Sequence, residues 1–205
     1  SFWNEHATTQ LGIWSTDKSG DVDGFGVWDS EEGDGGFAAG ARFTLVPWAK
    51  DKCRFLHLGA SASYRETDSV QLRARPGLGT GPRLVDTGTL SPLADDKLMI
   101  YNAELAFVWN SLHAAAEYTI VDLDDAGRGD PSFSAWYVQA GWFLTGEAKA
   151  YNFKTGTWAN SKPCCNFLSN NCCCWGGWEL AARYDTIDLN DGTIAGGEMT
   201  NIAAG

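Results

Sequence analysis

A regular alternation of apolar and polar residues restricts how this chain can fold. Between Leu98 and Trp109, for example, Leu105 falls on one face of an extended segment and Glu104 on the other, because successive side chains of a β-strand point in opposite directions. The same alternation is found at residues 7–13, 37–45, 55–65, 98–109, 112–120, 136–145 and 178–185. These seven segments predict an all-β fold. At residues 111–118, three alanines leave a helix as the alternative.

The connections and the aromatic residues favour strands that cross a membrane. The connections at residues 47–52 and 110–111 are short, whereas those at 17–36, 66–97 and 122–131 are long, as in outer-membrane barrels. The chain holds 10 Trp, 10 Phe and 6 Tyr, and such side chains gather where lipid headgroups meet the hydrocarbon. No run of 18 apolar residues exists, which excludes a transmembrane helix. We predict an antiparallel transmembrane β-barrel of the outer membrane, with a soluble β-sandwich as the alternative.

In such a barrel the apolar face contacts lipid and the polar face lines a water-filled lumen. The side chains expected to face lipid are Leu56, Leu58, Leu105, Phe107, Ala140, Trp142, Leu180 and Ala182. The side chains expected to line the lumen are Arg42, His57, Ser61, Arg65, Glu104, Glu117, Gln139 and Arg183. Arg183 has an alternative role as the ion-pair partner of Asp185 or Glu179. His57 and His113 belong to no ligand cluster, so we interpret both as polar residues of the wall.

The charge and the motifs restrict the function. A net charge of −11 argues against nucleic acid binding, which needs clustered Lys and Arg. Much of the acid lies between Asp17 and Asp34, in what we interpret as a solvated loop. A divalent-cation site that bridges this loop to anionic lipid is the alternative. No hydrolase, metalloprotease or phosphate-loop motif is present, so we expect neither an enzyme nor a cofactor. The N-terminus lacks the features of a signal peptide, which leaves a mature chain or an internal fragment.

Five of the six cysteines lie close together, at Cys164, Cys165, Cys172, Cys173 and Cys174. Their spacing is not that of a zinc finger or zinc ribbon, so we predict no metal site. We prefer the interpretation that these five positions hold small residues that were misread as cysteines. Disulfides in an oxidising loop and, as the least favoured, a thiolate metal site stay open.

Nine short blocks of the sequence can be compared with the sequences of known proteins. Two of them are GARFTLVPW at residues 40–48 and WELAARY at residues 178–184; the others lie at residues 56–61, 73–76, 85–88, 130–133, 137–140, 143–147 and 188–191. In this order they resemble the phosphate-selective porin O and P family of outer-membrane proteins. The resemblance covers most of the chain after Gly36, while the acidic segment before it matches poorly.

The resemblance implies a sixteen-stranded barrel that assembles as a homotrimer among outer-membrane lipid and lipopolysaccharide. By that likeness, residues 1–205 are part of a single barrel domain and supply about strands seven to thirteen and the start of the next. The N-terminal and C-terminal strands are then missing, since an open sheet edge cannot lie in lipid. The implied function is passive diffusion of small anions such as phosphate. The acidic residues of the lumen keep a general diffusion porin open, and an adhesin or structural anchor is the alternative without transport.

The family likeness also implies an arginine ladder carried partly by the long loop after the ninth strand, which folds into the lumen. In this sequence that loop runs from Glu66 to Lys97 and contains Arg73, Arg75 and Arg83. Arg73 and Arg75 are two residues apart and would point the same way in an extended segment. Guanidinium groups match phosphate oxygens, so these three are the candidate anion-binding residues. Ion pairs with Asp86, Glu66 or lipopolysaccharide phosphates are the alternative.

Overall fold

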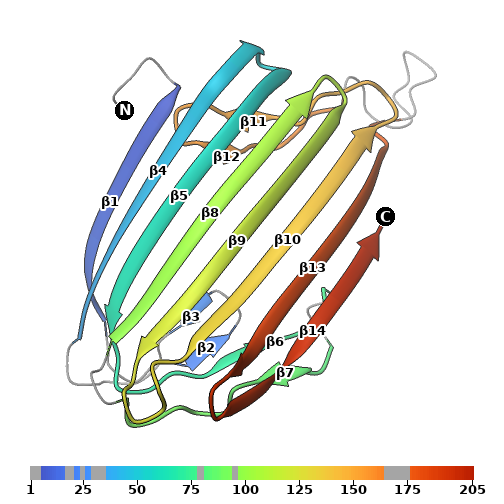
Figure 1. The fold of residues 1–205 in the computed structure, drawn as a ribbon. Coiled ribbons are helices and arrows are strands. Elements are labelled where there is room, and N and C mark those ends of the chain that lie inside the picture. Colours follow the sequence, from blue (N-terminus) through green and yellow to red (C-terminus); the bar gives the residue numbers. More distant parts are fainter. Residues whose placement is uncertain are drawn as a thin grey trace.

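The computed structural model describes residues 6–16, 21–23, 26–28, 36–77, 81–93, 97–163 and 176–205. Eight long strands form one antiparallel sheet in the order β1-β4-β5-β8-β9-β10-β13-β14 (Figure 1). Their bounds are Ala7–Thr16 for β1, Gly36–Asp51 for β4, Arg54–Glu66 for β5, Lys97–Trp109 for β8, Leu112–Asp124 for β9, Ser132–Phe143 for β10, Glu179–Asp191 for β13 and Ile194–Ala204 for β14. The seven expected strands are confirmed, and residues 112–118 are strand rather than helix.

The two ends of this sheet are open. β1 and β14 lie at opposite edges and are not paired with each other (Figure 1). β14 has 11 residues, so it is a full strand where only the start of one was expected. Closure into a sixteen-stranded barrel stays a prediction. Among the described residues, the structure has no helix long and apolar enough to cross a membrane.

One of the two expected short turns is in place and the other is shifted. β8 and β9 are joined at Asn110 and Ser111, and Asn110 takes a φ of 53°. The prediction of a turn at residues 47–52 is wrong, because β4 continues to Asp51. The pairing of β4 with β5 shifts register between Leu45 and Trp48. This irregularity accommodates Pro47, which has no N–H to donate.

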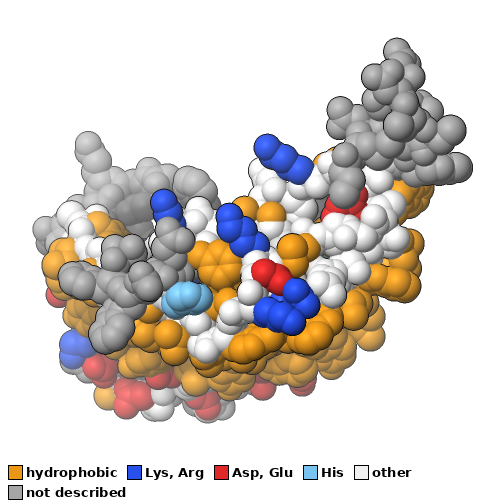
Figure 2. All heavy atoms as spheres, turned by 90° about the horizontal axis from the view of Figure 1, so that it is seen from above, with side chains coloured by type: hydrophobic (Ala, Val, Ile, Leu, Met, Phe, Trp, Pro, Cys, Tyr) orange, Lys and Arg blue, Asp and Glu red, His pale blue; other side chains and the backbone are white. Residues whose placement is uncertain are grey.

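The alternation separates an apolar outer face from a polar inner face. On the outer face Leu105 is 42% exposed and Leu180 is 54% exposed, although both are large and hydrophobic. Trp48 and Trp109 stack there with their ring centres 5.9 Å apart, at the rim of the short turns. Figure 2 shows hydrophobic side chains along one flank of the sheet and charged side chains gathered inside it. The outer face is that expected of strands in lipid.

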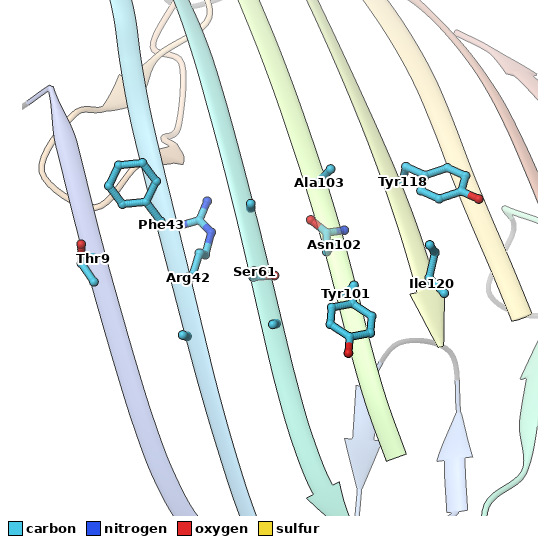
Figure 3. Close-up of a pocket in the computed structure, with 12 residues that line it drawn as sticks. Thr9, Arg42, Phe43, Ser61, Tyr101, Asn102, Ala103, Tyr118 and Ile120 are labelled. Atoms are coloured by element: carbon cyan, nitrogen blue, oxygen red, sulfur yellow. The ribbon is translucent and has the colours of Figure 1, made fainter. Parts of the chain in front are cut away.

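A shallow depression of about 500 Å³ interrupts this outer face (Figure 3). Alanines form its floor and larger side chains surround it; those facing outward are Thr9, Ala41, Phe43, Ala60, Ala62, Tyr101, Ala103, Tyr118 and Ile120. None of them carries a charge at neutral pH, so the depression extends the apolar surface.

Two smaller sheets lie behind the large one, on its inner face (Figure 1). The first is the hairpin of β11 (Tyr151–Asn152) and β12 (Thr157–Trp158). The second has the order β3-β2-β6-β7, with β3 at Gly26–Trp28, β2 at Asp21–Asp23, β6 at Leu72–Ala74 and β7 at Val85–Asp86. In this second sheet β2 and β6 run parallel.

The long loop after β5 is anchored by an apolar cluster. Its residues Val70, Leu72, Val85, Leu90 and Leu93 are buried against Leu98, Val121, Leu123, Phe133, Leu189, Ile194 and Met199 of the large sheet. Burial of a Val or Leu side chain contributes roughly 1.5–3 kcal/mol. The loop therefore folds back over the inner face, as the family resemblance implies.

Candidate functional site

Cross-strand pairing sets a row of polar side chains at one level of the inner face. Glu104 of β8 lies opposite Glu117 of β9, which lies opposite Tyr137 of β10. The row continues through Asp185 of β13 to Asn201 of β14. Both Glu104 and Glu117 were predicted to line the lumen, and both lie on this face.

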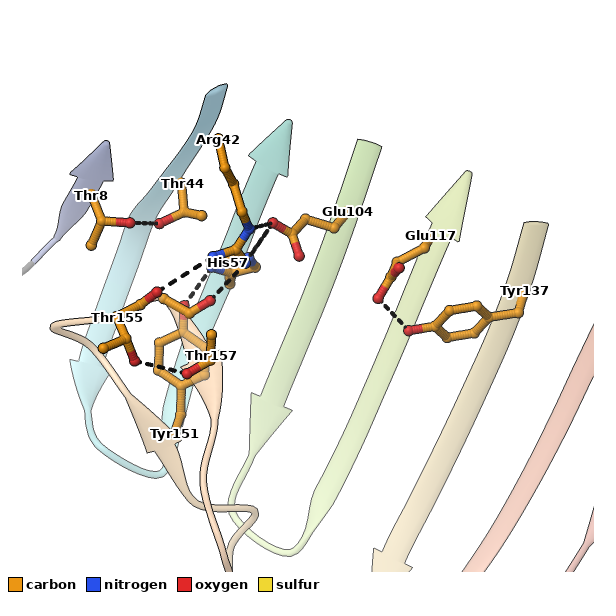
Figure 4. Close-up of polar contacts among 11 residues, drawn as sticks. Thr8, Arg42, Thr44, His57, Glu104, Glu117, Tyr137, Tyr151, Thr155 and Thr157 are labelled. Atoms are coloured by element: carbon orange, nitrogen blue, oxygen red, sulfur yellow. Dashed lines mark hydrogen bonds and ion pairs between the residues drawn. The ribbon is translucent and has the colours of Figure 1, made fainter. Parts of the chain in front are cut away.

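Arg42 joins this row to the β11–β12 hairpin (Figure 4). Its Nε donates to Oε1 of Glu104 at 2.8 Å, and its second terminal nitrogen is 2.7 Å from the same oxygen. The terminal nitrogens also donate to the carbonyls of Gly156 at 2.9 Å and Thr155 at 3.4 Å. The guanidinium thus binds one carboxylate and two carbonyls, so its charge is largely compensated within the wall.

His57 lies on the inner face as predicted, but the hairpin covers it. The residue is only 3% exposed, and the hydroxyl of Tyr151 is 2.5 Å from its Nδ1. Burial raises the pKa of Tyr151 to about 12, so the hydroxyl keeps its proton at neutral pH. The Tyr151 ring also packs with Phe153 against Phe55. Aromatic packing and this polar contact together hold the hairpin on the wall.

His113 occupies a second covered position beside the hairpin. Its Nε2 is 3.1 Å from Oε1 of Glu179, and Lys149 Nζ is 3.6 Å from that oxygen. The Trp158 ring meets the imidazole edge-on at 6.3 Å between ring centres. A Cβ at Gly141 would lie 2.5 Å from the imidazole Nε2, so the glycine provides the space that His113 occupies.

Arg183 is bound to its own neighbours, in the alternative role foreseen for it. Its Nε donates to Oδ1 of Asp185 at 2.9 Å, and a terminal nitrogen reaches Oε1 of Gln139 at 3.4 Å. Its guanidinium stacks on the Tyr137 ring, with Cζ 3.7 Å from the ring centre. The Tyr137 hydroxyl in turn donates to Oε1 of Glu117 at 2.5 Å (Figure 4).

The three candidate anion-binding residues belong to the loop that lies over this wall. Leu72 and Ala74 of β6 pack toward the apolar cluster; Arg73 lies between them in the strand, and Arg75 follows the end of β6. Arg83 precedes β7, and the Leu84 N–H donates to the Ala74 carbonyl at 3.1 Å. Arg75 and Arg83 are therefore near the same end of the β6–β7 pair. Their binding of anions stays a prediction.

Arg75 lines a cavity of about 200 Å³ between the loop and the wall. Glu117, Tyr137, Arg183 and Asp185 line it from the large sheet. Positive and negative side chains thus face the same space. In the part of the chain that the structure describes, no group of His, Cys, Asp and Glu has the arrangement of a metal site.

Other sequence predictions are placed as follows. Ser61 and Arg65 are half-buried and lie on the inner face of β5, in register with Asn102 and Leu98. The acidic segment from Asp17 to Asp34 lies largely outside the described residues, as do Cys164, Cys165, Cys172, Cys173 and Cys174.

The site residues missed from the sequence are those of the segment before β13. Tyr151, Trp158, Lys149 and the carbonyls of Thr155 and Gly156 all contact the inner wall. Their strands have two residues each, too few to show alternation. Only the aromatic side chains of this connection could have signalled a packed segment.

Comparison with known proteins supplies independent information. A family model described as phosphate-selective porin O and P matches residues 3–205. An uncharacterised protein of Caulobacter vibrioides is 33% identical over an alignment of 152 residues, and the match covers 70% of this chain and 29% of that protein. Porin O of Pseudomonas aeruginosa is 27% identical over an alignment of 167 residues, and this match covers 71% of this chain and 36% of porin O. The chain spans about a third of the length of these curated relatives.

Proposed function

The chain belongs to the phosphate-selective porin O and P family, and on this basis we propose that it forms wall and inner loops of an outer-membrane channel. The channel would carry small anions such as phosphate by passive diffusion. The observation that carries the proposal is a sheet with an apolar outer face whose long loop folds back over the polar inner face. A water-filled pore through lipid needs this division of faces.

We assign the anion preference to the loop residues Arg73, Arg75 and Arg83. Conduction requires weak, repeated binding rather than one tight site, and successive guanidinium groups supply it. The wall arginines Arg42 and Arg183 are bound to carboxylates, which offset their charges. We further propose a homotrimer embedded in outer-membrane lipid and lipopolysaccharide, in line with the family resemblance.

A general diffusion porin is the second candidate, and the carboxylates of the inner row favour it. Glu104, Glu117 and Asp185 lie at one level of the wall, where their negative charges offset those of the wall arginines. In this candidate, solutes pass by size, with little preference for phosphate.

Conductance in planar lipid bilayers tests the proposal. We expect open channels whose reversal potential in a salt gradient reports a preference for chloride, and phosphate should block the chloride current. Replacing Arg73 and Arg75 by Ala should lower the anion preference and weaken the block. If the reversal potentials of this double variant are unchanged, the proposed anion preference is wrong and the general diffusion porin is favoured. Absence of channels from the unsubstituted protein would favour a barrel without transport.

A further inference from the structure

Glu104 and Glu117 form a like-charged pair in the centre of the inner face. They lie directly opposite one another on β8 and β9, and like charges in that position destabilise an antiparallel pair. Figure 4 shows the two side chains turned apart, Glu104 toward Arg42 and Glu117 toward Tyr137.

The negative charges of the two carboxylates are offset to different degrees by their neighbours. Glu104 has the Arg42 guanidinium at 2.7 Å. Glu117 accepts a hydrogen bond from the Tyr137 hydroxyl at 2.5 Å, which orients the carboxylate but adds no positive charge. Within the described part of the chain, no Lys or Arg side chain is in ion-pair distance of Glu117.

The nearest cation of the wall does not neutralise Glu117 either. Arg183 stacks on the far side of the hydrogen bond, over the Tyr137 ring, and its Nε is bound to Asp185 at 2.9 Å. Arg183 therefore fixes the position of the Tyr137 ring by stacking, and the Tyr137 hydroxyl orients the Glu117 carboxylate. Glu117 lines the 200 Å³ cavity together with Thr119 and Arg75.

We propose that Glu117 is a specificity-determining residue that attracts small cations and lowers the anion preference of the channel. This inference rests on the proposed channel function. Tyr137 and Arg183 act as positioning residues, because they affect the permeating ions only by orienting the Glu117 carboxylate. A negative unit charge about 6 Å from a permeating ion, in water with physiological salt, raises the local concentration of cations almost twofold. It lowers the local concentration of anions by the same factor. Removing it should therefore raise the anion-to-cation permeability ratio about threefold.

The test compares reversal potentials of E117Q and E198Q channels in planar bilayers with a potassium chloride gradient. Both substitutions remove one negative charge, but Glu198 is exposed and pairs in register with Asp188 on the outer face. We expect a higher anion-to-cation ratio in E117Q alone. Y137F keeps the charge of Glu117 but removes the hydrogen bond that positions it, so its ratio should lie between those of the unsubstituted protein and E117Q. If E117Q channels insert too rarely to record, E117A provides the same comparison.

The possible results separate the two proposals. Conducting channels whose permeability ratio is the same in E117Q and in the unsubstituted protein would overturn the role of Glu117. An equal rise in E198Q would also overturn it, because the effect would then come from net charge and not from position. Absence of conductance in every variant and in the unsubstituted protein would instead contradict the channel function itself.

Discussion

Replacing Arg42 by glutamine should release the β11–β12 hairpin from the wall. The guanidinium bridges Glu104 of β8 and the carbonyls of Thr155 and Gly156, which are more than 110 residues away in sequence. Glutamine is shorter and uncharged, so it cannot bind all three groups together. The large sheet itself keeps its backbone pairing in the variant.

The size of the effect follows from the hydrogen bonds that the guanidinium donates to the hairpin. A hydrogen bond that involves a charged group contributes roughly 1.5–3 kcal/mol. The bond to Gly156, at 2.9 Å, has normal length, whereas the bond to Thr155, at 3.4 Å, is long and weak. The Arg42 side chain is 23% exposed, so water replaces part of this stabilisation in the variant. We expect docking to weaken by about 2 kcal/mol, which is about a thirtyfold larger undocked population.

Limited proteolysis measures this population. Lys154 lies in the hairpin turn, and cleavage there follows the fraction of molecules in which the hairpin is undocked. Trypsin should therefore cut R42Q at Lys154 about thirty times faster than the unsubstituted protein. R54Q is the matched control, because Arg54 pairs with Asp51 across the β4–β5 turn. Equal cleavage of R42Q and R54Q would refute the role of Arg42 as the anchor.

Three further predictions concern the outer face, the packing of the inner wall and the effect of alkaline pH. L105R places a charge on the lipid face and should cost about 2–4 kcal/mol in urea titrations of folding into vesicles; an unchanged midpoint would contradict the assignment of faces. G141A puts a Cβ 2.5 Å from Nε2 of His113 and 2.9 Å from Oε1 of Glu179, and the same titration should show a loss of about 1–3 kcal/mol. Because burial raises the pKa of Tyr151 from 10.0 to about 12, its contribution to docking is full below pH 10 and declines as the pH approaches 12. Undocking, followed by the near-ultraviolet circular dichroism of the hairpin aromatic residues, should rise across that range in the unsubstituted protein and not in Y151F.

The large sheet could be predicted because its signal is local. In β8 and β9, alternate residues differ sharply in polarity, and Asn110 marks the turn between them. The error at Pro47 has a physical reason. Proline ends most central strands, but here the register shift between Leu45 and Trp48 lets the strand continue.

The loop after β5 was harder to interpret from sequence. Its Gly, Asp and Pro content indicates a solvated connection, yet Val70, Leu72 and Leu90 are buried against the sheet. These residues are spaced irregularly, so no periodicity marks them. Their partners come from β8, β9, β10, β13 and β14, and contacts over such distances in the chain have no local signature. The Arg42 anchor was missed for the same reason.

The inner wall shows why the number of arginines does not by itself predict selectivity. Alternation correctly places Arg42 and Arg183 on the polar face, but each is bound to a carboxylate of the same wall. Such a pair adds little net potential at the distance of a permeating ion, because the two opposite charges nearly cancel. Glu117 instead accepts a hydrogen bond from the Tyr137 hydroxyl, which adds no opposite charge. In the proposed channel, the preference between anions and cations would therefore depend on the balance between the loop arginines and this carboxylate, and a sequence that shows residue types without their partners cannot supply that balance.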